Sequence, residues 1–255
     1  MFQAISKRSV SDEVFEQLCN RIVSRELKAG EELPSERLLS EMLGVSRNAV
    51  REAIKRLQQA RMVEVKHGGT TTVLDYRIEA GADLLPSLLF DRQGRIQVDV
   101  ARSIVRMRQV LSPEIAGDAA GNGGPTTADR LDAIVDAMVV AVAPAELQRL
   151  AFEFWEVLVD GSGNIAYRLA FNSLRKTYEP IWDLLTKMLG RDLQKLGAFR
   201  KLAVMVRQGD RGGAMECARE YIDGSSNAIY QFLDLYEQHA QTAPKDGPPE
   251  ARRAP

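Results

Sequence analysis

The sequence has little of the chemistry on which metal sites and disulfide frameworks depend. Its 255 residues include two cysteines, Cys19 and Cys217, and two histidines, His67 and His239. Two cysteines so far apart in the chain do not make a disulfide framework, which favours a reducing cytoplasm as the location. Because histidine and cysteine are the usual ligands of transition metals, we expect no metal site, and we expect no cofactor.

Long apolar runs and enzyme motifs are missing as well. The N-terminal residues lack the continuous apolar core of a signal peptide, and no later segment is long and uncharged enough to span a membrane. The sequence has no glycine-rich phosphate loop, and Gly161-Ser162-Gly163 is interpreted as a helix break. Since no histidine lies between His67 and His239 to serve a nucleophile, we expect the protein not to be an enzyme.

Neither sign of charge dominates. The chain has 34 lysines and arginines against 35 aspartates and glutamates, for a formal net charge of -1. DNA affinity would therefore come from a local basic patch, which a neutral total does not exclude. The length allows a small domain and a larger one with its own core.

Residues 33–76 carry the most specific pattern in the chain. Ser35 is expected to cap a short helix that Gly44 ends, and Ser46 is expected to cap a second helix. Apolar residues recur at helical spacing in both, so each helix has one side to bury. The apolar residues are Leu38, Leu39, Met42 and Leu43 in the first helix, and Ala49, Val50, Ala53, Ile54 and Leu57 in the second.

The outer face of the second expected helix is basic. It holds Arg47, Asn48, Arg51 and Lys55. Arg47 and Arg51 are four residues apart, so they are neighbours near the helix N-terminus, where a recognition helix meets base edges in the major groove. Guanidinium groups suit the O6 and N7 atoms of guanine. This face therefore predicts DNA recognition, although charge pairs on a helix are also typical of a solvated surface.

A hairpin follows the second helix. Residues 62–65 and 70–73 read as two strands, joined by Lys66-His67-Gly68-Gly69. The glycines allow a tight turn, and the tip is small and basic enough to enter a minor groove. We interpret the hairpin as a wing; a protein-interaction module with a solvated turn is the alternative.

These motifs resemble the winged helix-turn-helix of GntR-type bacterial repressors, in which LPSER, GVSR, VREA and an HGG-like wing occur in this order. The resemblance implies that eight positions contact the operator DNA. At one of them an alanine stands where the family has a polar residue. The eight positions are Arg37, Ser46, Arg47, Asn48, Ala49, Arg51, His67 and Gly68.

The rest of the chain indicates helices alone. A helix from Ser11 to about Glu26 should pack behind the DNA-reading pair. Later helices are expected at residues 97–120, 126–142, 145–159, 164–189, 191–208 and 211–238, with Gly190 among the breaks. We predict a mainly α fold: a winged helix-turn-helix domain at 1–76, a linker with a short helix at 77–95, an all-α effector-binding and dimerisation domain at 96–240, and a disordered tail at 241–255.

An all-α bundle behind this DNA-reading module places the chain, by resemblance, in the FadR-like branch of the superfamily. Many such relatives hold a metal with an aspartate and three histidines. Here Ala151 stands at the acid position, and Trp155, Phe199 and Tyr221 stand where histidines are expected. The resemblance implies instead a pocket for acyl-CoA or another organic anion. Its lining positions are Arg108, Phe154, Tyr178, Ser226 and Tyr230.

The sequence thus predicts a cytoplasmic homodimer that binds a palindromic DNA operator and answers to a small-molecule effector, in the regulation of fatty-acid or lipid metabolism. Two alternatives stay open. One is a regulator of sugar-acid or amino-acid catabolism that responds to a small carboxylate. The other is a helical lipid-binding protein with an appended DNA module.

Overall fold

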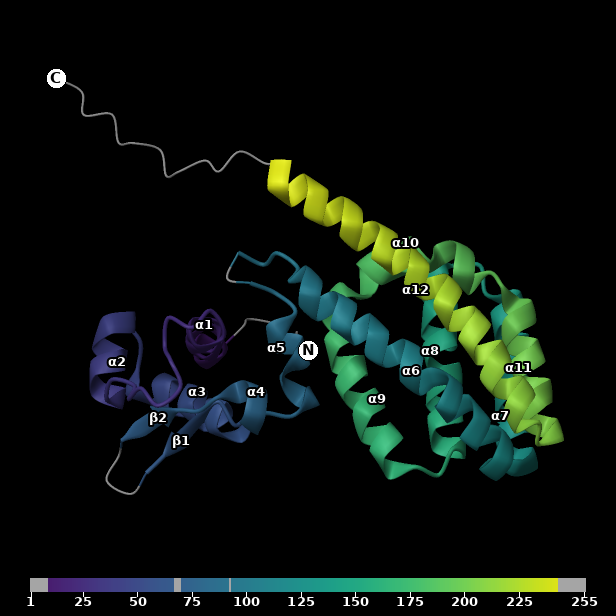
Figure 1. The fold of residues 1–255 in the computed structure, drawn as a ribbon, viewed down its shortest axis with the longest axis horizontal. Coiled ribbons are helices and arrows are strands. Elements are labelled where there is room, and N and C mark those ends of the chain that lie inside the picture. Colours follow the sequence, from purple (N-terminus) through teal and green to yellow (C-terminus); the bar gives the residue numbers. More distant parts are fainter. Residues whose placement is uncertain (1–8, 67–69, 92, 243–255) are drawn as a thin grey trace, which may run out of the picture. The chain divides into compact units, whose positions relative to one another are not determined.

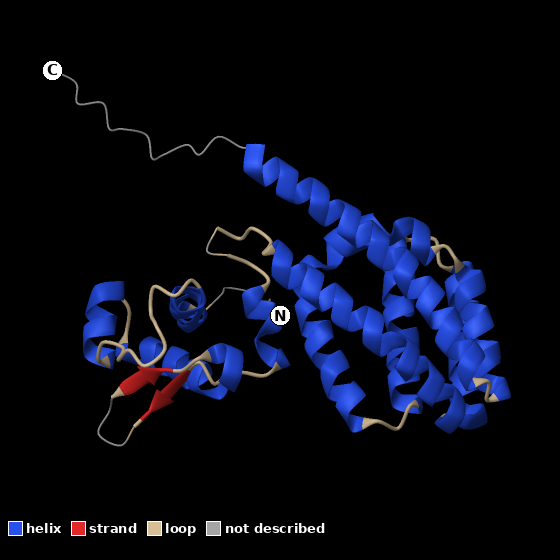
Figure 2. Cartoon of the chain, viewed as in Figure 1, coloured by secondary structure: helices blue, strands red, loops and turns tan. Residues whose placement is uncertain are grey.

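The chain folds into helices with one small antiparallel sheet, as a computed structural model describes for residues 9–66, 70–91 and 93–242 (Figures 1 and 2). Its contacts divide it into two compact units. The first runs through Ile104 and also takes in Ile165–Trp182, and the second holds Val105–Asn164 and the described residues from Asp183 onward. The mainly α fold with an N-terminal helix-turn-helix is as predicted.

Helix α1 (Val10–Val23) begins earlier than the sequence predicted. Its cap is Ser9, whose Oγ accepts a hydrogen bond from the Asp12 N–H at 3.2 Å, while the Ser9 N–H donates to Asp12 Oδ2 at 3.0 Å. This reciprocal capping box satisfies two backbone donors at once, and Ser11 as a cap would forgo it. The helix ends at Val23 because Arg25 takes a left-handed backbone conformation, with φ of 60°.

The helix-turn-helix is present with the predicted caps, but Leu38 and Met42, expected on the buried side of the first helix, are exposed. Helix α2 spans Glu36–Leu43 and α3 spans Arg47–Gln59, and Ser35 and Ser46 cap them by accepting the Leu38 and Ala49 N–H groups. Gly44 ends α2 with φ of 65°, a region that suits glycine. The turn between the two helices is therefore set by local hydrogen bonds.

The expected wing strands are present. Strand β1 (Val63–Val65) pairs antiparallel with β2 (Thr71–Val73), with Val63 opposite Val73 (Figure 2). We call α1, α2, α3, β1 and β2 the reading head. The tip of the wing at residues 67–69 lies outside the described residues.

The core of the reading head forms where α1 and α2 pack against α3. Val50, Ala53 and Leu57 of α3 are completely buried, so its apolar stripe is used as the spacing predicted. At the far end of α3, the Arg56 guanidinium pairs with Asp12 and stacks over the Phe15 ring at 4.2 Å from its centroid. This contact fixes α1 behind the recognition helix.

The linker is more helical than expected. It contains α4 (Tyr76–Glu79), a short 3-10 helix η1 (Ala82–Leu84) and α5 (Leu85–Leu88), with Pro86 in the first turn of α5. Both η1 and α5 pack against α9 (Ile165–Tyr178), a helix far along the chain that belongs to the same compact unit.

The second unit holds most of α6 (Val98–Asn122) and the remaining helices. The remaining helices are α7 (Gly124–Val140), α8 (Pro144–Gly161), α10 (Trp182–Leu193), α11 (Leu196–Gln208) and α12 (Arg211–Thr242). Helix α7 packs against α8 and α11, and α11 packs against α12. Their buried Leu, Val, Ile and Ala side chains form the core of this unit.

Two further predicted helix boundaries were wrong. The single helix expected at residues 164–189 is divided into α9 and α10 by a 3-10 turn, η2 (Glu179–Ile181), because Pro180 removes a backbone donor there. The break expected at Gly190 does not occur, since glycine weakens a helix by only about 1 kcal/mol and α10 continues to Leu193. Helix α12 also runs on through residues 241–242, the start of the expected tail, while residues 243–255 lie outside the described residues.

Across the described ranges, no helix combines the length and the hydrophobicity that crossing a lipid bilayer requires.

Candidate nucleic-acid interface

The N-terminal half of α3 presents polar side chains outward. Ser46 Oγ accepts the Ala49 N–H at 3.2 Å, which satisfies a backbone donor at the start of the helix. Arg47 and Asn48, the first two residues after this cap, are exposed, whereas Ala49 is half-buried. The capped turn thus places Arg47 at an open helix N-terminus.

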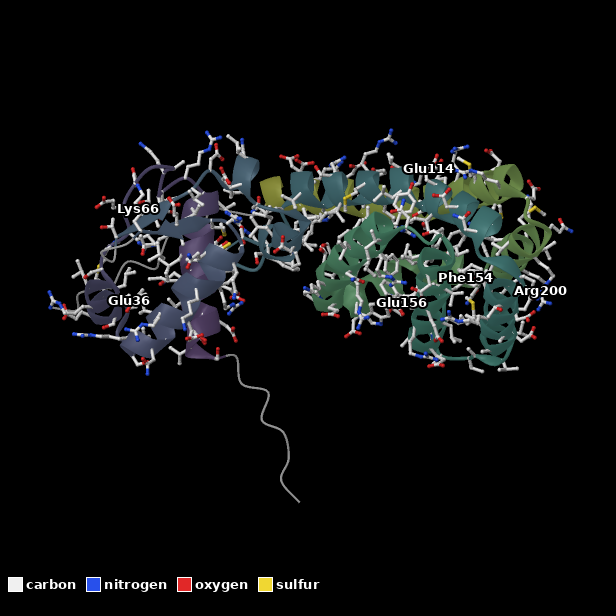
Figure 3. The ribbon with its side chains drawn as sticks, turned by 90° about the horizontal axis from the view of Figure 1, so that it is seen from below. Glu36, Lys66, Glu114, Phe154, Glu156 and Arg200 are labelled. Atoms are coloured by element: carbon white, nitrogen blue, oxygen red, sulfur yellow. The ribbon has the colours of Figure 1, made fainter. Side chains whose placement is uncertain are left out.

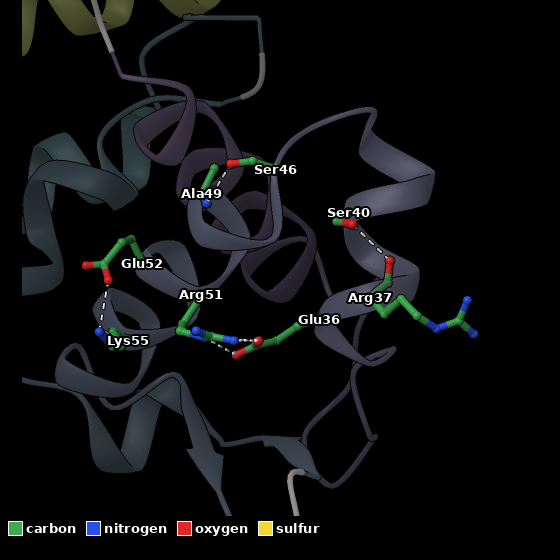
Figure 4. A network of polar contacts seen from close by, with 8 residues as sticks. All are labelled: Glu36, Arg37, Ser40, Ser46, Ala49, Arg51, Glu52 and Lys55. Atoms are coloured by element: carbon green, nitrogen blue, oxygen red, sulfur yellow. Dashed lines mark hydrogen bonds and ion pairs between the residues drawn. The ribbon is translucent and has the colours of Figure 1, made fainter.

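One turn further along α3, Arg51 is exposed but already has a partner. Its Nε donates to Glu36 Oε1 at 3.3 Å and to Oε2 at 3.1 Å, and its Nη2 donates to Oε2 at 3.0 Å (Figure 4). Glu36 comes from the first turn of α2, so the pair joins the two helices of the motif. The side chain of Arg51 remains 52% exposed and that of Glu36 36% exposed. The hydrogen bonds to Glu36 raise the pKa of Arg51 above its ordinary value, and the guanidinium stays charged.

The other polar contacts of this face stay within single helices. Arg37 of α2 donates to Glu41 Oε1 at 2.9 Å, one turn on, and Figure 4 shows its guanidinium pointing away from the Glu36 and Arg51 pair. On α3, Lys55 pairs with Glu52 at 2.9 Å. Exposed pairs at this spacing contribute little to stability.

The structure brings five of the eight predicted DNA positions onto the exposed surface of α2, the turn and α3. They are Arg37, Ser46, Arg47, Asn48 and Arg51. Ala49 lies beside them, half-buried, and the predicted His67 and Gly68 lie outside the described residues. The neighbouring Lys66, labelled in Figure 3, is exposed at the end of β1. Contact of these positions with DNA stays a prediction.

Glu36 is the residue that the sequence reading missed. It precedes the predicted Arg37 and lies 15 positions before Arg51. The only signal was a carboxylate in the first turn of α2, which is also typical of a residue that complements the helix dipole. The crossing of α2 over α3 is what makes it a partner of Arg51.

The second unit has an aromatic cluster where family relatives were expected to hold a metal. Phe154, labelled in Figure 3, is completely buried and meets Phe199 edge to face, with ring centroids 5.0 Å apart. Phe199 in turn meets the Tyr221 ring at 4.8 Å. Ala151 and Trp155, at the other positions, are buried and offer no carboxylate or imidazole. Apolar rings in contact do not fit a metal ion, which needs oxygen, nitrogen or sulfur ligands. Within the described residues, no three His, Cys, Asp or Glu side chains gather as metal ligands would.

A polar network joins α6 and α12 inside this unit. The Tyr230 hydroxyl donates to Gln109 Oε1 at 3.0 Å, and Gln109 Nε2 donates to Asp223 Oδ1 at 2.7 Å. Ser226 lies between Asp223 and Tyr230 on α12; it is completely buried, and its Oγ has no hydrogen-bond partner among the described residues. A buried hydroxyl without a partner costs free energy of folding.

The structure therefore groups some of the predicted effector residues. Ser226 and Tyr230 share one face of α12, and the half-buried Arg108 is next to Gln109 in α6. Phe154 belongs to the aromatic cluster of the same unit. Tyr178, at the end of α9, falls in the first compact unit. Gln109 was not predicted, because a glutamine in a helix has no motif around it.

Comparisons with known proteins match both parts of the chain. The family model described as "Bacterial regulatory proteins, gntR family" matches residues 10–73, and the FCD domain model matches residues 103–224. The chain is 41% identical to "HTH-type transcriptional regulator Mce2R" of Mycobacterium tuberculosis over 91% of this chain and 96% of that protein. It is 24% identical to "Fatty acid metabolism regulator protein" of Proteus mirabilis, over 81% of this chain and 84% of that protein.

A solved structure described as "Lar controls the expression of the Listeria monocytogenes agr system and mediates virulence" resembles the fold. Its TM-score is 0.57 at 14% identity, and the match covers 89% of this chain and 99% of that one. Both named relatives are regulators rather than enzymes, as the sequence predicted for this chain.

Proposed function

The chain belongs to the GntR family of bacterial transcriptional regulators, with an FCD domain behind its helix-turn-helix, and from this premise we propose that it is a dimeric, effector-responsive regulator of fatty-acid or lipid metabolism. It binds a palindromic operator through α3 and the wing. The DNA-contacting residues are Arg37, Ser46, Arg47, Asn48, Ala49, Arg51, His67 and Gly68.

One observation carries the DNA part of the proposal. Two exposed arginines, Arg47 and Arg51, lie one turn apart at the capped start of the second helix of a helix-turn-helix. A recognition helix enters the major groove with this end, and an arginine there reaches guanine edges. Arg47 and Arg51 do not belong to the core, because the buried apolar residues of α3 lie on its other side.

Dimerisation follows from the size of the reading head. A single recognition helix covers one half-site, so a palindromic operator calls for two copies related by twofold symmetry. The FCD domain is the part that we propose joins the copies. Effector binding there would favour one spacing of the two reading heads over another and so change the affinity for DNA.

The effector that we propose is an acyl-CoA or a related organic anion. The similarity to a fatty acid metabolism regulator supports this class, as do the side chains of Ala151, Trp155, Phe199 and Tyr221, which are not metal ligands. Arg108 supplies a cation for the anionic group, and Ser226 and Tyr230 supply hydroxyls. Phe154 contributes the aromatic lining. Tyr178 belongs to the other compact unit and is left out of this proposed set.

The DNA part is tested by selection from a pool of duplexes with a randomised centre, at about 0.15 M ionic strength. The expected result is enrichment of an inverted repeat bound by two copies of the chain, with the mass of the complex measured by sedimentation. Recovery of random sequence would overturn it.

The effector part is tested by melting temperature and by affinity for the selected duplex, each with a long-chain acyl-CoA, free CoA or a short carboxylate added. We expect the acyl-CoA to raise the melting temperature and to weaken DNA binding. Ser226→Ala should lower this response while leaving the melting temperature of the protein alone unchanged or higher, because it removes an unpartnered hydroxyl. If none of the three compounds changes the melting temperature or the DNA affinity, the proposed effector class is rejected.

A further inference from the structure

The contact between Glu36 and Arg51 is the one ion pair that ties the two helices of the helix-turn-helix together among the described pairs of the reading head. It is bidentate, with both carboxylate oxygens engaged. Most exposed ion pairs leave their side chains free to rotate, but a fork-to-fork pair fixes the plane of the guanidinium.

The pair uses only one edge of the guanidinium. Nε and Nη2 of Arg51 donate to Glu36, whereas Nη1 has no hydrogen-bond partner among the described residues. A guanidinium has five N–H groups, so the edge formed by Nη1 and the second N–H of Nη2 remains available. Two parallel donors on that edge match O6 and N7 of a guanine.

The carboxylate also changes the charge of the surface. Glu36 puts a negative charge 3.0 Å from the Arg51 nitrogen, on a face expected to meet a polyanion. Affinity for DNA of any sequence grows with the number of phosphates that the protein neutralises. A negative charge on such a face works against non-specific binding.

We propose that Glu36 is a positioning residue, which holds Arg51 in one orientation for base reading and so raises the discrimination between DNA sequences rather than the affinity for DNA as such. The inference rests on the proposed function. It differs from a purely structural role, in which the pair would only fasten α2 to α3.

The experiment compares three variants with the wild-type chain. Each is measured with the duplex that the wild type selects from a randomised pool and with a scrambled duplex of the same base composition, over a series of salt concentrations. The variants are Glu36→Gln, Arg51→Ala and the double variant. Glu52→Gln is the matched control, because it removes an equal charge from the same surface but pairs with Lys55 within α3.

For Glu36→Gln, we expect the affinity for the scrambled duplex to rise and the ratio of selected to scrambled affinity to fall about tenfold, the size of one lost base contact. In single-base-pair variants of the selected duplex, the preference should be lost at the same base pair as in Arg51→Ala. The double variant should lose no more discrimination than Arg51→Ala alone, since the two residues act as a unit. Glu52→Gln should bind both duplexes more tightly by the same factor.

Three results would count against these ideas, and they are distinguishable. If the wild type selects no sequence, the proposed function fails and the inference fails with it. If the wild type discriminates and Glu36→Gln keeps the full ratio, the positioning role alone is overturned. If Glu36→Gln has a lower melting temperature and binds both duplexes more weakly by the same factor, the pair only fastens α2 to α3. That result would also overturn the positioning role.

Discussion

Single side chains decide what the recognition helix can read. Arg47 and Arg51 share a face of α3, but Arg51 is paired with Glu36, while Lys66 is exposed just after the end of β1. These surroundings predict different roles: base reading for the two arginines, and attraction to phosphate for the lysine.

Replacing Arg47 or Arg51 by alanine should therefore reduce affinity for the selected duplex by about 1–3 kcal/mol and blur its sequence preference. Lys66→Ala should weaken selected and scrambled duplexes alike and reduce the slope of log affinity against log salt by about one. Fluorescence anisotropy over a salt series measures both. Equal losses on both duplexes for the arginine variants would contradict the assigned roles.

The buried thiol of Cys19 allows a prediction about pH. Burial raises its pKa from the ordinary 9.0 to about 12. The thiolate is the reactive form, so Cys19 of the folded protein should resist iodoacetamide at pH 9, whereas the denatured chain should be modified there. Peptide mass spectrometry identifies the modified residue.

The same shift affects stability. The folded protein keeps the proton that the unfolded chain releases above pH 9.0, so the stabilising contribution is complete below pH 9.0 and is lost as the pH rises towards about 12. The free energy of unfolding is measured against pH for the wild type and for Cys19→Ala, which lacks the titrating group. The difference between the two curves is the contribution of Cys19. If the free energy of unfolding changes with pH by the same slope in the two proteins between pH 9 and 11, the prediction is refuted.

At the scale of single elements, serine caps fix where the reading helices start. Ser46 Oγ accepts a backbone N–H at the start of α3, whereas Ser40 Oγ within α2 donates to the Arg37 carbonyl at 3.1 Å. The first bond satisfies a donor that the helix leaves open, and the second only adds to a carbonyl within a helix.

Ser46→Ala should thus lower the free energy of unfolding by about 1 kcal/mol. The matched change Ser40→Ala should remain within about 0.5 kcal/mol of wild type. Chemical denaturation without DNA measures the difference, because Ser46 is also a proposed DNA contact. A similar stability for the two variants would remove the cap from the account of α3.

The same local logic explains which element boundaries could be predicted. Ser35, Gly44 and Ser46 act through neighbours a few residues away, so the sequence placed α2 and α3 correctly. The start of α1 was misplaced because Ser9 and Ser11 are both plausible caps, and only the bond from Ser9 back to Asp12 distinguishes them. Gly190 was misread since a glycine weakens a helix without having to end it.

On the scale of the whole molecule, the compact units do not follow the order of the chain. Helix α9 comes after α8 in sequence but packs against η1 and α5, which follow the wing. Leu174 of α9 is 6% exposed, whereas Leu169 of the same helix is 60% exposed. The cover over the linker helices therefore depends on one face of α9.

We expect Leu174→Ala to increase the rate of hydrogen exchange in residues 82–88 and to leave α3 protected, because it removes buried apolar contact from the unit that holds the linker. Leu169→Ala, at an exposed position of the same helix, should change neither. Exchange followed by mass spectrometry resolves the two segments. Unchanged exchange at 82–88 in Leu174→Ala would show that α9 does not support the linker.

The sequence by itself determined the helix-turn-helix, the class of the protein and the absence of metal-ligating side chains at positions 151, 155, 199 and 221. Those conclusions depend on which residues are present and on spacings of a few positions, which hydrogen bonds within a helix or turn translate directly into structure. The tertiary structure alone decided that Glu36 clamps Arg51 across 15 positions, that Tyr230 meets Gln109 across 121, and that α9 covers the linker. Such pairs form only where helices cross, and the crossing is set by the packing of whole apolar faces rather than by any local pattern.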